Sequence, residues 1–197
     1  MKKTKNYPVV GVLSLQGDFQ EHIEILAKLQ IRHLKVTKTE DLDKINGLII
    51  PGGESTTIIK LLKSNGLFKE TKKRIRSGLP TWGTCAGAII LAKNVTGLKL
   101  ETLNILEINV TRNAYGRQKE SFKADVKIPK LNKKRFPGIF IRAPKINKIS
   151  NKIKTIAKLE NGEIVGIEEE NIMITTFHPE LTNDHSLHEY FLNKILT

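Results

Sequence analysis

Leu79-Pro80-Thr81-Trp82-Gly83-Thr84-Cys85-Ala86-Gly87-Ala88-Ile89-Ile90-Leu91 is the stretch of sequence that decides the fold. It begins as a buried strand, and residues 86–93 form an apolar segment with small side chains that fits a helix packed against a sheet. Between the two lies Cys85, with Gly83 and Gly87 two residues away on either side. Glycines around a nucleophile at a strand-to-helix junction are typical of the sharp turn that exposes a catalytic side chain.

The turn at Cys85 has a steric and an electrostatic logic. Its neighbours need little or no side chain, because the nucleophile is held in a tight backbone conformation with its sulfur exposed. At the N-terminus of the following helix, unpaired N–H groups and the positive end of the dipole favour thiolate over thiol. The pattern therefore predicts a nucleophilic Cys85. The alternative is an ordinary buried cysteine, with glycines that let the helix approach the sheet.

The first half of the chain alternates short apolar runs with amphipathic ones. Such alternation predicts strands joined by helices across a mostly parallel sheet. Asp18 is the expected N-cap of the first helix, and His22 is expected to pack within the apolar stripe of that helix. Strands are expected near residues 9–15, 33–36, 47–50 and 79–82, and helices near residues 18–30, 56–64, 68–77 and 86–93.

The second half of the chain has a different texture. Beyond Gly97, short apolar runs separated by turn residues predict hairpins, or a mixed or antiparallel extension of the sheet. No repeat, low-complexity tract or linker divides the chain, so residues 1–197 are expected to form one α/β domain. The runs lie near residues 105–110, 122–128, 138–141, 154–159, 164–167 and 172–177, and a closing helix is expected at residues 184–196.

Composition narrows the class of protein. Apolar residues make up 39% of the 197 residues, which is enough for one core, and no apolar run approaches the ~20 residues of a membrane span. The charged N-terminus lacks the cleavage signature of a signal peptide. Cys85 is the single cysteine, so no intrachain disulfide and no all-cysteine metal site can form within one chain. The expected location is the cytoplasm.

The formal charge of +13 suggests a polyanionic partner such as nucleic acid. Two features argue against that partner. Lysines greatly outnumber arginines and are scattered from Lys2 to Lys194, and aromatic residues, which stack on bases, are only 6% of the chain. Usage rich in lysine and isoleucine is equally typical of genome composition or of growth at high temperature. We therefore expect no nucleic-acid partner and no membrane partner.

A thiolate nucleophile needs a base, and His178 is the best-placed histidine. It follows the strand expected at residues 172–177, and the carboxyl end of a strand in an open α/β sheet faces the crevice where ligands bind. Glu180 lies two residues on, and in an extended segment such positions point to the same side, so its carboxylate could hold the imidazole tautomer. The alternative for His178-Pro179-Glu180 is an ordinary turn that ends a strand.

Pro51-Gly52-Gly53-Glu54-Ser55 follows another expected strand. Backbone N–H groups of this loop and of Ala86 could form a hole for the oxyanion of a tetrahedral intermediate, although Pro-Gly-Gly is also a common turn. The sequence has no phosphate-binding loop and no dinucleotide-binding glycine motif. Its histidines lack the spacing of a zinc hydrolase. We therefore expect neither a cofactor nor a metal ion.

Taken together, these motifs give the chain a resemblance to a known family. Pro51-Gly52-Gly53-Glu54, Gly83-Thr84-Cys85-Ala86-Gly87 and Phe177-His178-Pro179-Glu180 resemble, in that order, the motifs of class I, triad-type glutamine amidotransferases. More narrowly, the chain looks like the glutaminase subunit of pyridoxal 5′-phosphate synthase, over nearly its whole length. That closer resemblance is carried by Leu15-Gln16-Gly17-Asp18-Phe19 with Glu21-His22, by Gly52-Gly53-Glu54-Ser55-Thr56-Thr57, by Arg112-Asn113-Ala114-Tyr115-Gly116-Arg117-Gln118 with Ser121-Phe122, and by Phe140-Ile141-Arg142-Ala143-Pro144.

The resemblance implies a flavodoxin-like three-layer sandwich and the hydrolysis of glutamine to glutamate and ammonia. By motif, it assigns Cys85 as the nucleophile, His178 as the general acid and base, and Glu180 as the orienting carboxylate. An arginine suits a substrate carboxylate because its planar fork can donate two parallel hydrogen bonds. The implied glutamine-binding residues are Gly53, Glu54, Ser55, Arg112, Ile141 and Arg142, and the implied backbone donors to the oxyanion are Gly52, Gly53 and Ala86.

The resemblance also implies a partner. Ammonia would pass to a synthase subunit that builds the cofactor from a pentose phosphate and a triose phosphate, in a hetero-oligomer of roughly 12 + 12 subunits. The sequence departs from the family pattern in two places. Trp82 stands where a smaller residue is common, and residues 98–107 match the family's usual leucine-rich segment only loosely. The alternatives are a glutaminase that serves another synthase, such as one making imidazole glycerol phosphate or a nucleotide, and a basic nucleic-acid-binding protein with a vestigial site.

Overall fold

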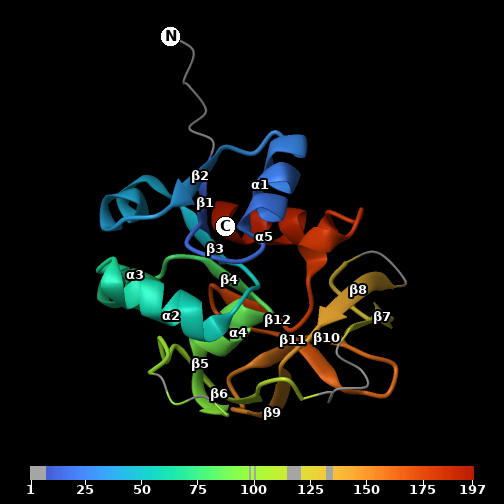
Figure 1. Cartoon of the computed structure of the whole chain (residues 1–197). Coiled ribbons are helices and arrows are strands. Elements are labelled where there is room, and N and C mark those ends of the chain that lie inside the picture. The colour runs from blue at the N-terminus through green and yellow to red at the C-terminus, as the bar shows by residue number, and fades with distance from the viewer. Residues whose placement is uncertain (1–7, 98, 100, 115–120, 132–134) are drawn as a thin grey trace.

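The structure is a computed structural model that describes residues 8–97, 99, 101–114, 121–131 and 135–197. A seven-stranded sheet forms its middle layer (Figure 1). The elements in chain order are β1 (Val10–Leu13), α1 (Phe19–Lys28), β2 (His33–Val36), the 3₁₀ helix η1 (Thr39–Lys44), β3 (Gly47–Ile50), α2 (Ser55–Ser64), α3 (Leu67–Arg76), β4 (Thr81–Thr84), α4 (Ala86–Leu91), β5 (Ala92–Thr96), β6 (Leu106–Thr111), β7 (Ser121–Val126), β8 (Phe136–Ile141), β9 (Lys145–Ile149), β10 (Lys154–Lys158), β11 (Ile164–Glu169), β12 (Ile172–Thr175), the 3₁₀ helix η3 (Pro179–Leu181) and α5 (Ser186–Leu196).

The order of strands in the large sheet is β10-β11-β12-β4-β3-β1-β2. From β2 to β12 the neighbouring strands pair in parallel, and β11 and β10 continue the sheet in antiparallel fashion. The parallel part has the 2-1-3-4-5 order of the flavodoxin-like doubly wound fold. The predicted fold class, a mostly parallel sheet with an antiparallel extension, is therefore confirmed.

Each face of the sheet is covered by its own apolar cluster. One cluster joins the sheet to α2, α3, α4 and the small β5-β6-β9 sheet, through residues such as Ile58, Leu67 and Ile108. The other joins it to α1, α5 and the β7-β8 hairpin, through residues such as Leu26 and Phe191. Figure 1 shows the two groups of helices on opposite sides of the sheet. The result is a three-layer sandwich, because a sheet with two apolar faces must bury both of them.

The first helix, α1, has the predicted N-cap residue, but the side chain of that residue has another partner. Its apolar stripe is buried as expected, and it includes His22, which is 0% exposed. Asp18 does occupy the N-cap position, but its side chain makes no capping hydrogen bond. Its carboxylate contacts His178 instead. The predicted N-cap residue is therefore confirmed, and its carboxylate binds a buried imidazole instead of the N–H groups of the helix.

Two strand and helix ends in the site region also differ from the sequence expectation. The helix expected at residues 86–93 ends at Leu91, because Ala92 starts a strand that pairs with β6. The strand expected at residues 172–177 ends at Thr175, and η3 follows it. Strands β5 and β9 and the helix η1 were not anticipated. Leu98 and residues 115–118 of the longest family motif lie outside the described residues.

The sheet brings four loops to one edge. Strands β1, β3, β4 and β12 are neighbours and run parallel, so their carboxyl ends lie side by side. Ligands of open α/β sheets bind at this edge. The segments that follow the four strands carry Asp18, Gly52 to Ser55, Cys85 and His178, respectively. Among the described residues, we find no helix with the length and apolarity needed to cross a membrane.

Candidate active site

Cys85 sits on the sharp turn between β4 and α4. Its backbone angles are φ 46° and ψ −99°, a conformation that residues with a side chain rarely adopt. Its N–H donates to the Thr175 carbonyl at 2.8 Å, which ties the turn to β12. A Cβ on Gly87 would lie 2.1 Å from the Ile50 carbonyl oxygen. Glycine at position 87 therefore lets α4 pack tightly on β3. The two explanations for the glycines, close packing of the helix and a strained turn at Cys85, thus both apply.

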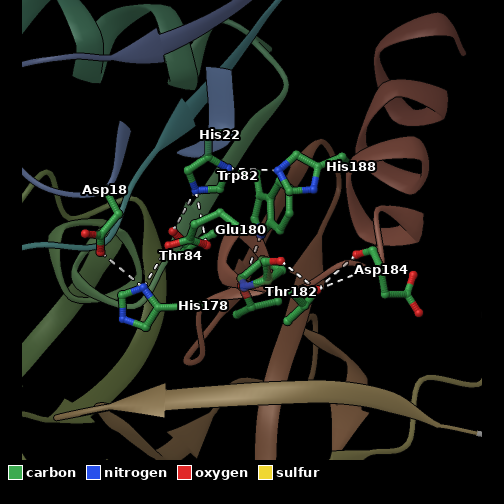
Figure 2. A network of polar contacts seen from close by, with 11 residues as sticks. Asp18, His22, Trp82, Thr84, His178, Glu180, Thr182, Asp184 and His188 are labelled. Atoms are coloured by element: carbon green, nitrogen blue, oxygen red, sulfur yellow. Dashed lines mark hydrogen bonds and ion pairs between the residues drawn. The ribbon is translucent and has the colours of Figure 1, made fainter. Parts of the chain in front are cut away.

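His178 lies directly behind the cysteine turn and carries two carboxylates on one nitrogen. Its Nδ1 is 2.7 Å from Glu180 Oε1 and 3.3 Å from Asp18 Oδ2 (Figure 2). Its backbone N–H donates to the Ile139 carbonyl at 2.8 Å. His178 is only 3% exposed, so these contacts are largely shielded from water. Glu180 lies in η3 and not in an extended segment, so the reasoning from strand alternation was wrong, although the two side chains do meet.

The electrostatics of this cluster favour an imidazolium. Burial lowers the pKa of His178, but hydrogen bonds with Asp18, Cys85 and Glu180 outweigh it and raise that pKa to about 12. The hydrogen bond with His178 in turn lowers the pKa of Asp18. Burial raises the pKa of Glu180, and the hydrogen bond from His178 opposes that rise. His178 is therefore poised to hold a proton beside the sulfur of Cys85 at neutral pH.

A cavity of about 260 Å³ opens in front of Cys85 and His178. All six side chains or glycines expected to bind glutamine line it. Glu180 does not line it, but it contacts His178, which does. Gly52 and Ala86, expected as backbone donors, are also not among the lining residues. The lining residues are Gln16, Gly17, Asp18, Gly53, Glu54, Ser55, Cys85, Ile89, Arg112, Asn113, Ile141, Arg142 and His178.

Glu54 and Arg112 form an ion pair in this cavity. Arg112 donates from Nη2 to Glu54 Oε1 at 2.9 Å, and the Thr56 hydroxyl donates to the same oxygen at 3.0 Å. The side chain of Glu54 is 40% exposed and that of Arg112 is 19% exposed, so both can still reach a ligand. The backbone N–H of Glu54 donates to Gln16 Oε1 at 2.8 Å, which fixes the loop. The cavity thus presents a carboxylate and a guanidinium side by side, complementary to the two charges of an α-amino acid.

Backbone strain concentrates around the cavity. Among the described residues, six that are not glycine have positive φ, and three of these line the cavity: Cys85 at 46°, Asn113 at 48° and Arg142 at 44°. Such strain persists only where the surrounding structure enforces it, and it clusters at binding and catalytic sites. Arg142 is exposed at the rim. The Ile141 carbonyl lies 3.8 Å from the Cys85 sulfur, which donates to it.

The glycine loop after β3 presses directly on the imidazole. A Cβ on Gly52 would lie 2.4 Å from His178 Cε1. The Gly52 carbonyl accepts the Asp18 N–H at 3.1 Å, and since a trans peptide points its C=O and N–H in opposite directions, the Gly53 N–H faces away from Asp18. On the other side of the sulfur, Ala86 is the first residue of α4, where an N–H has no partner within the helix.

Sequence reasoning missed two groups of residues in this region. Gln16 and Asp18 line the cavity and hold the loop and the imidazole, and the only signal was their place in the Leu15-Gln16-Gly17-Asp18-Phe19 motif. His188 in α5 contacts His22, and no local pattern indicated it. The expectation that His22 packs in the core was confirmed, since the residue is fully buried.

Asp18, His178 and Glu180 are also the one group of potential metal ligands found among the described residues, with ligand atoms within 4.8 Å of one another. His178 Nδ1 is the atom that both carboxylates contact. A protonated Nδ1 that donates to a carboxylate has no lone pair for a metal ion. The arrangement is therefore that of a hydrogen-bonded acid and base.

Known proteins share this sequence and this fold. Residues 12–197 match the SNO glutamine amidotransferase family. A pyridoxal 5′-phosphate synthase subunit PdxT of Dehalococcoides mccartyi is 48% identical over 93% of this chain and 95% of that protein, and one of Thermotoga maritima is 47% identical over 94% and 98%. A crystal structure described as a glutamine amidotransferase has a TM-score of 0.90 and 45% identity, and it covers 95% of this chain and 99% of its own. The chain therefore belongs to the SNO glutamine amidotransferase family.

Proposed function

We propose that this chain hydrolyses the side-chain amide of glutamine and delivers the ammonia to a pyridoxal 5′-phosphate synthase subunit. One observation carries the first half of the proposal: a single cavity holds a strained cysteine, an imidazole backed by carboxylates, and an ion pair suited to an α-amino acid. The names of the relatives support the second half. We further propose that residues 1–197 act as one glutaminase domain in the cytoplasm.

Glutamine fits the polarity of the cavity from end to end. Its α-carboxylate pairs with the guanidinium of Arg112, and its α-ammonium pairs with the carboxylate of Glu54. The existing ion pair opens to accept these groups, so each protein charge exchanges one partner for another and neither is left unpaired in the cavity. The side-chain amide then extends toward Cys85. The remaining contacts come from Gly53, Ser55, Ile141 and Arg142, which line the same cavity.

The reaction proceeds by acyl transfer. The thiolate of Cys85 attacks the amide carbon, and the oxyanion that forms is held by backbone N–H groups of Gly52, Gly53 and Ala86. His178 protonates the amide nitrogen, the C–N bond breaks and ammonia leaves, with a thioester on the sulfur. His178 then takes a proton from water, whose oxygen attacks the thioester. Glutamate departs and the thiolate returns, so glutamine and water become glutamate and ammonia.

Glu180 acts in this cycle through His178. Its hydrogen bond to Nδ1 at 2.7 Å leaves Nε2 as the nitrogen that exchanges protons with the sulfur and the substrate. The same bond stabilises the imidazolium that forms when the ring accepts a proton. Asp18 adds a second negative charge at 3.3 Å and supports the same state of the ring.

The partner assigned here is a synthase subunit, in a complex of roughly 12 + 12 chains as expected from the resemblance. Because ammonia is lost to bulk water once it is protonated, a glutaminase of this kind serves its partner by direct transfer. A glutaminase that serves another synthase is the competing assignment. It has the same triad and differs in the partner that binds and stimulates it.

The test measures glutamate release by the chain alone and with the candidate synthase subunit, together with formation of pyridoxal 5′-phosphate. We expect Cys85→Ala to abolish glutamate release while folding, followed by circular dichroism, and association, followed by sedimentation, stay as in the wild type. Wild-type turnover in this variant would contradict the role of Cys85. A synthase subunit that neither binds nor stimulates the chain would contradict the partner. Steeply salt-dependent polyanion binding without amidase activity would favour the nucleic-acid alternative.

A further inference from the structure

Behind Glu180 lies a buried group of aromatic residues that takes no part in the cycle above. His22 of α1 and His188 of α5 are 0% and 1% exposed. Trp82 of β4 stands edge-on to both, with ring centroids 5.7 Å and 4.9 Å away. Figure 2 shows these rings on the side of Glu180 opposite to His178. Burying a polar imidazole costs free energy unless its nitrogens are hydrogen-bonded, so the partners of these two histidines need to be identified.

The contacts form a continuous chain that ends at the catalytic imidazole. His22 Nε2 lies 3.4 Å from Glu180 Oε2 and 3.3 Å from Thr84 Oγ1. On its other side, His22 Nδ1 lies 2.9 Å from His188 Nε2. The other oxygen of Glu180, Oε1, contacts His178 Nδ1 at 2.7 Å. Each of the two Glu180 oxygens therefore faces an imidazole nitrogen: Oε1 faces His178, which immediately precedes η3, and Oε2 faces His22 of α1.

The hydrogen-bond chemistry gives this chain a direction. Glu180 Oε2 is buried and has no hydrogen-bond partner of normal geometry among the described residues, while His22 Nε2, which is hydrogen-bonded to Thr84 Oγ1, lies 3.4 Å from it. An ionised carboxylate only accepts, so the favourable arrangement has a hydrogen on His22 Nε2, between Thr84 Oγ1 and Glu180 Oε2. A neutral His22 then accepts at Nδ1, and His188 must carry its hydrogen on Nε2. The remaining atom, His188 Nδ1, has no hydrogen-bond partner among the described residues. With the opposite direction this atom would be a buried N–H without an acceptor, which is rare in folded proteins.

Both histidines are held in the neutral form that this direction requires. Burial and the proximity of His188 lower the pKa of His22 well below 6.5. Burial lowers the pKa of His188 to about 3. At neutral pH each ring therefore has one donor and one acceptor, which allows an ordered chain of donors from α5 to Glu180.

We propose that His22, held by His188 and Thr84, is a positioning residue for the glutaminase reaction: its Nε2–H faces the otherwise unpartnered Glu180 Oε2 at 3.4 Å and stabilises the ionised carboxylate that orients His178. This inference rests on the proposed function. The reason is the full burial of Glu180, whose side chain is 0% exposed. Without a donor on Oε2, burial favours a protonated or rotated Glu180, and the hydrogen bond to His178 Nδ1 weakens.

Three substitutions of His22 separate positioning from packing. Glutamine can place an amide nitrogen where the imidazole has Nε2, because both nitrogens are three bonds from Cβ. Asparagine reaches only the Nδ1 position, and phenylalanine has no donor. We expect His22→Gln to keep near-wild-type kcat, and His22→Asn and His22→Phe to lower kcat about tenfold or more with little change in KM, since a positioned acid-base group contributes roughly 10²- to 10⁴-fold. Equal kcat in all folded variants would overturn the proposal.

The alkaline limb of the pH profile provides a readout that packing alone does not move. His178 is faced by Asp18 from the loop before α1, by Cys85 from the α4 turn and by Glu180 from η3. Loosening Glu180 removes one group that raises the pKa of His178, so in His22→Asn the alkaline limb should move to lower pH. Alkylation of Cys85 by iodoacetamide across the same pH range gives a second profile that needs no glutamine.

A measurement on the wild-type chain keeps the test independent of whether the variants fold. Long-range ¹H–¹⁵N spectra of the ¹⁵N-labelled chain should show His22 and His188 as neutral rings with hydrogen on Nε2. Hydrogen on Nδ1 of either ring would overturn the proposal. If the wild type, with or without the synthase, releases no glutamate, then the proposed function fails. The tautomers and the alkylation profiles would still decide whether His22 positions Glu180.

Discussion

Replacing Gly52 with alanine should slow glutamine hydrolysis far more than it destabilises the fold. The added Cβ would lie 2.4 Å from His178 Cε1, whereas ordinary van der Waals contact begins at 3.4 Å, so the ring must move by 3.4 − 2.4 = 1.0 Å. A misplacement of about 1 Å in a catalytic group can cost about 10²-fold in rate. Overpacking in a buried site costs about 1–3 kcal/mol of stability. We therefore expect kcat to fall about 100-fold in a variant that still folds.

The assay compares Gly52→Ala with Gly11→Ala, a matched control in β1. A Cβ on Gly11 would lie 2.6 Å from Ile45 Cδ1, so the crowding is similar but far from the site. Glutamate release in the presence of the synthase gives kcat, urea unfolding gives the free energy of unfolding, and the Cε1–H resonance of His178 reports the movement of the ring. We expect both variants to lose similar stability and only Gly52→Ala to lose kcat. A Gly52→Ala enzyme with wild-type kcat and an unmoved resonance would refute this reasoning.

Three further predictions follow from the same contacts. Asp18→Asn removes a group that raises the pKa of His178, so the alkaline limb of kcat/KM should shift to lower pH; an unmoved limb would count against the Asp18 contact. His188 has a folded pKa of about 3 and an unfolded value of 6.5, so as pH falls between these values only the unfolded state gains a proton. This protonation of the unfolded state should cost the wild type about 1.4 kcal/mol of stability for each pH unit of the fall. Urea unfolding at several pH values should therefore show that the free energy of unfolding depends less steeply on pH in His188→Phe. Arg112→Lys keeps the charge but loses the planar fork, so KM for glutamine should rise roughly tenfold with kcat nearly unchanged; steady-state kinetics checks both.

Local sequence was sufficient for the parts of the fold that follow from periodicity. The bounds of β2 and β3 agree with the expected strands. In β2 polar and apolar residues alternate, and β3 is a short, fully buried apolar run, which are both patterns typical of strands. The helix after Cys85 is shorter than the one that the sequence predicted. Its apolar residues continue to Ala92, but pairing with β6 takes that residue into a strand. Local pattern does not contain the competing partner, which is 14 residues further along the chain.

The site shows the same division. The glycines around Cys85 and the tripeptide at His178 indicated a nucleophile and its base, because a tight turn and a strand end leave a local signature. The orientation of Glu180 was inferred from an extended segment, yet a 3₁₀ turn places it against His178. Asp18 is the N-cap of α1 as expected, but the sequence did not indicate that its carboxylate contacts the imidazole. Both contacts with His178 depend on the same cause, since the partner of a side chain is set by the residues that the fold brings near it.

By itself, the sequence determined the fold class, the sharp turn at Cys85 and the family, since glycine spacing and hydrophobic periodicity are properties of neighbouring residues. Only the tertiary structure decided that β1, β3, β4 and β12 would end side by side and gather Asp18, Cys85 and His178 in one cavity. It also decided that α1 and α5 would place His22 and His188 behind Glu180. The physical reason is that burial and hydrogen bonding depend on distance in space, and residues 22 and 188 meet only when the sheet has been assembled.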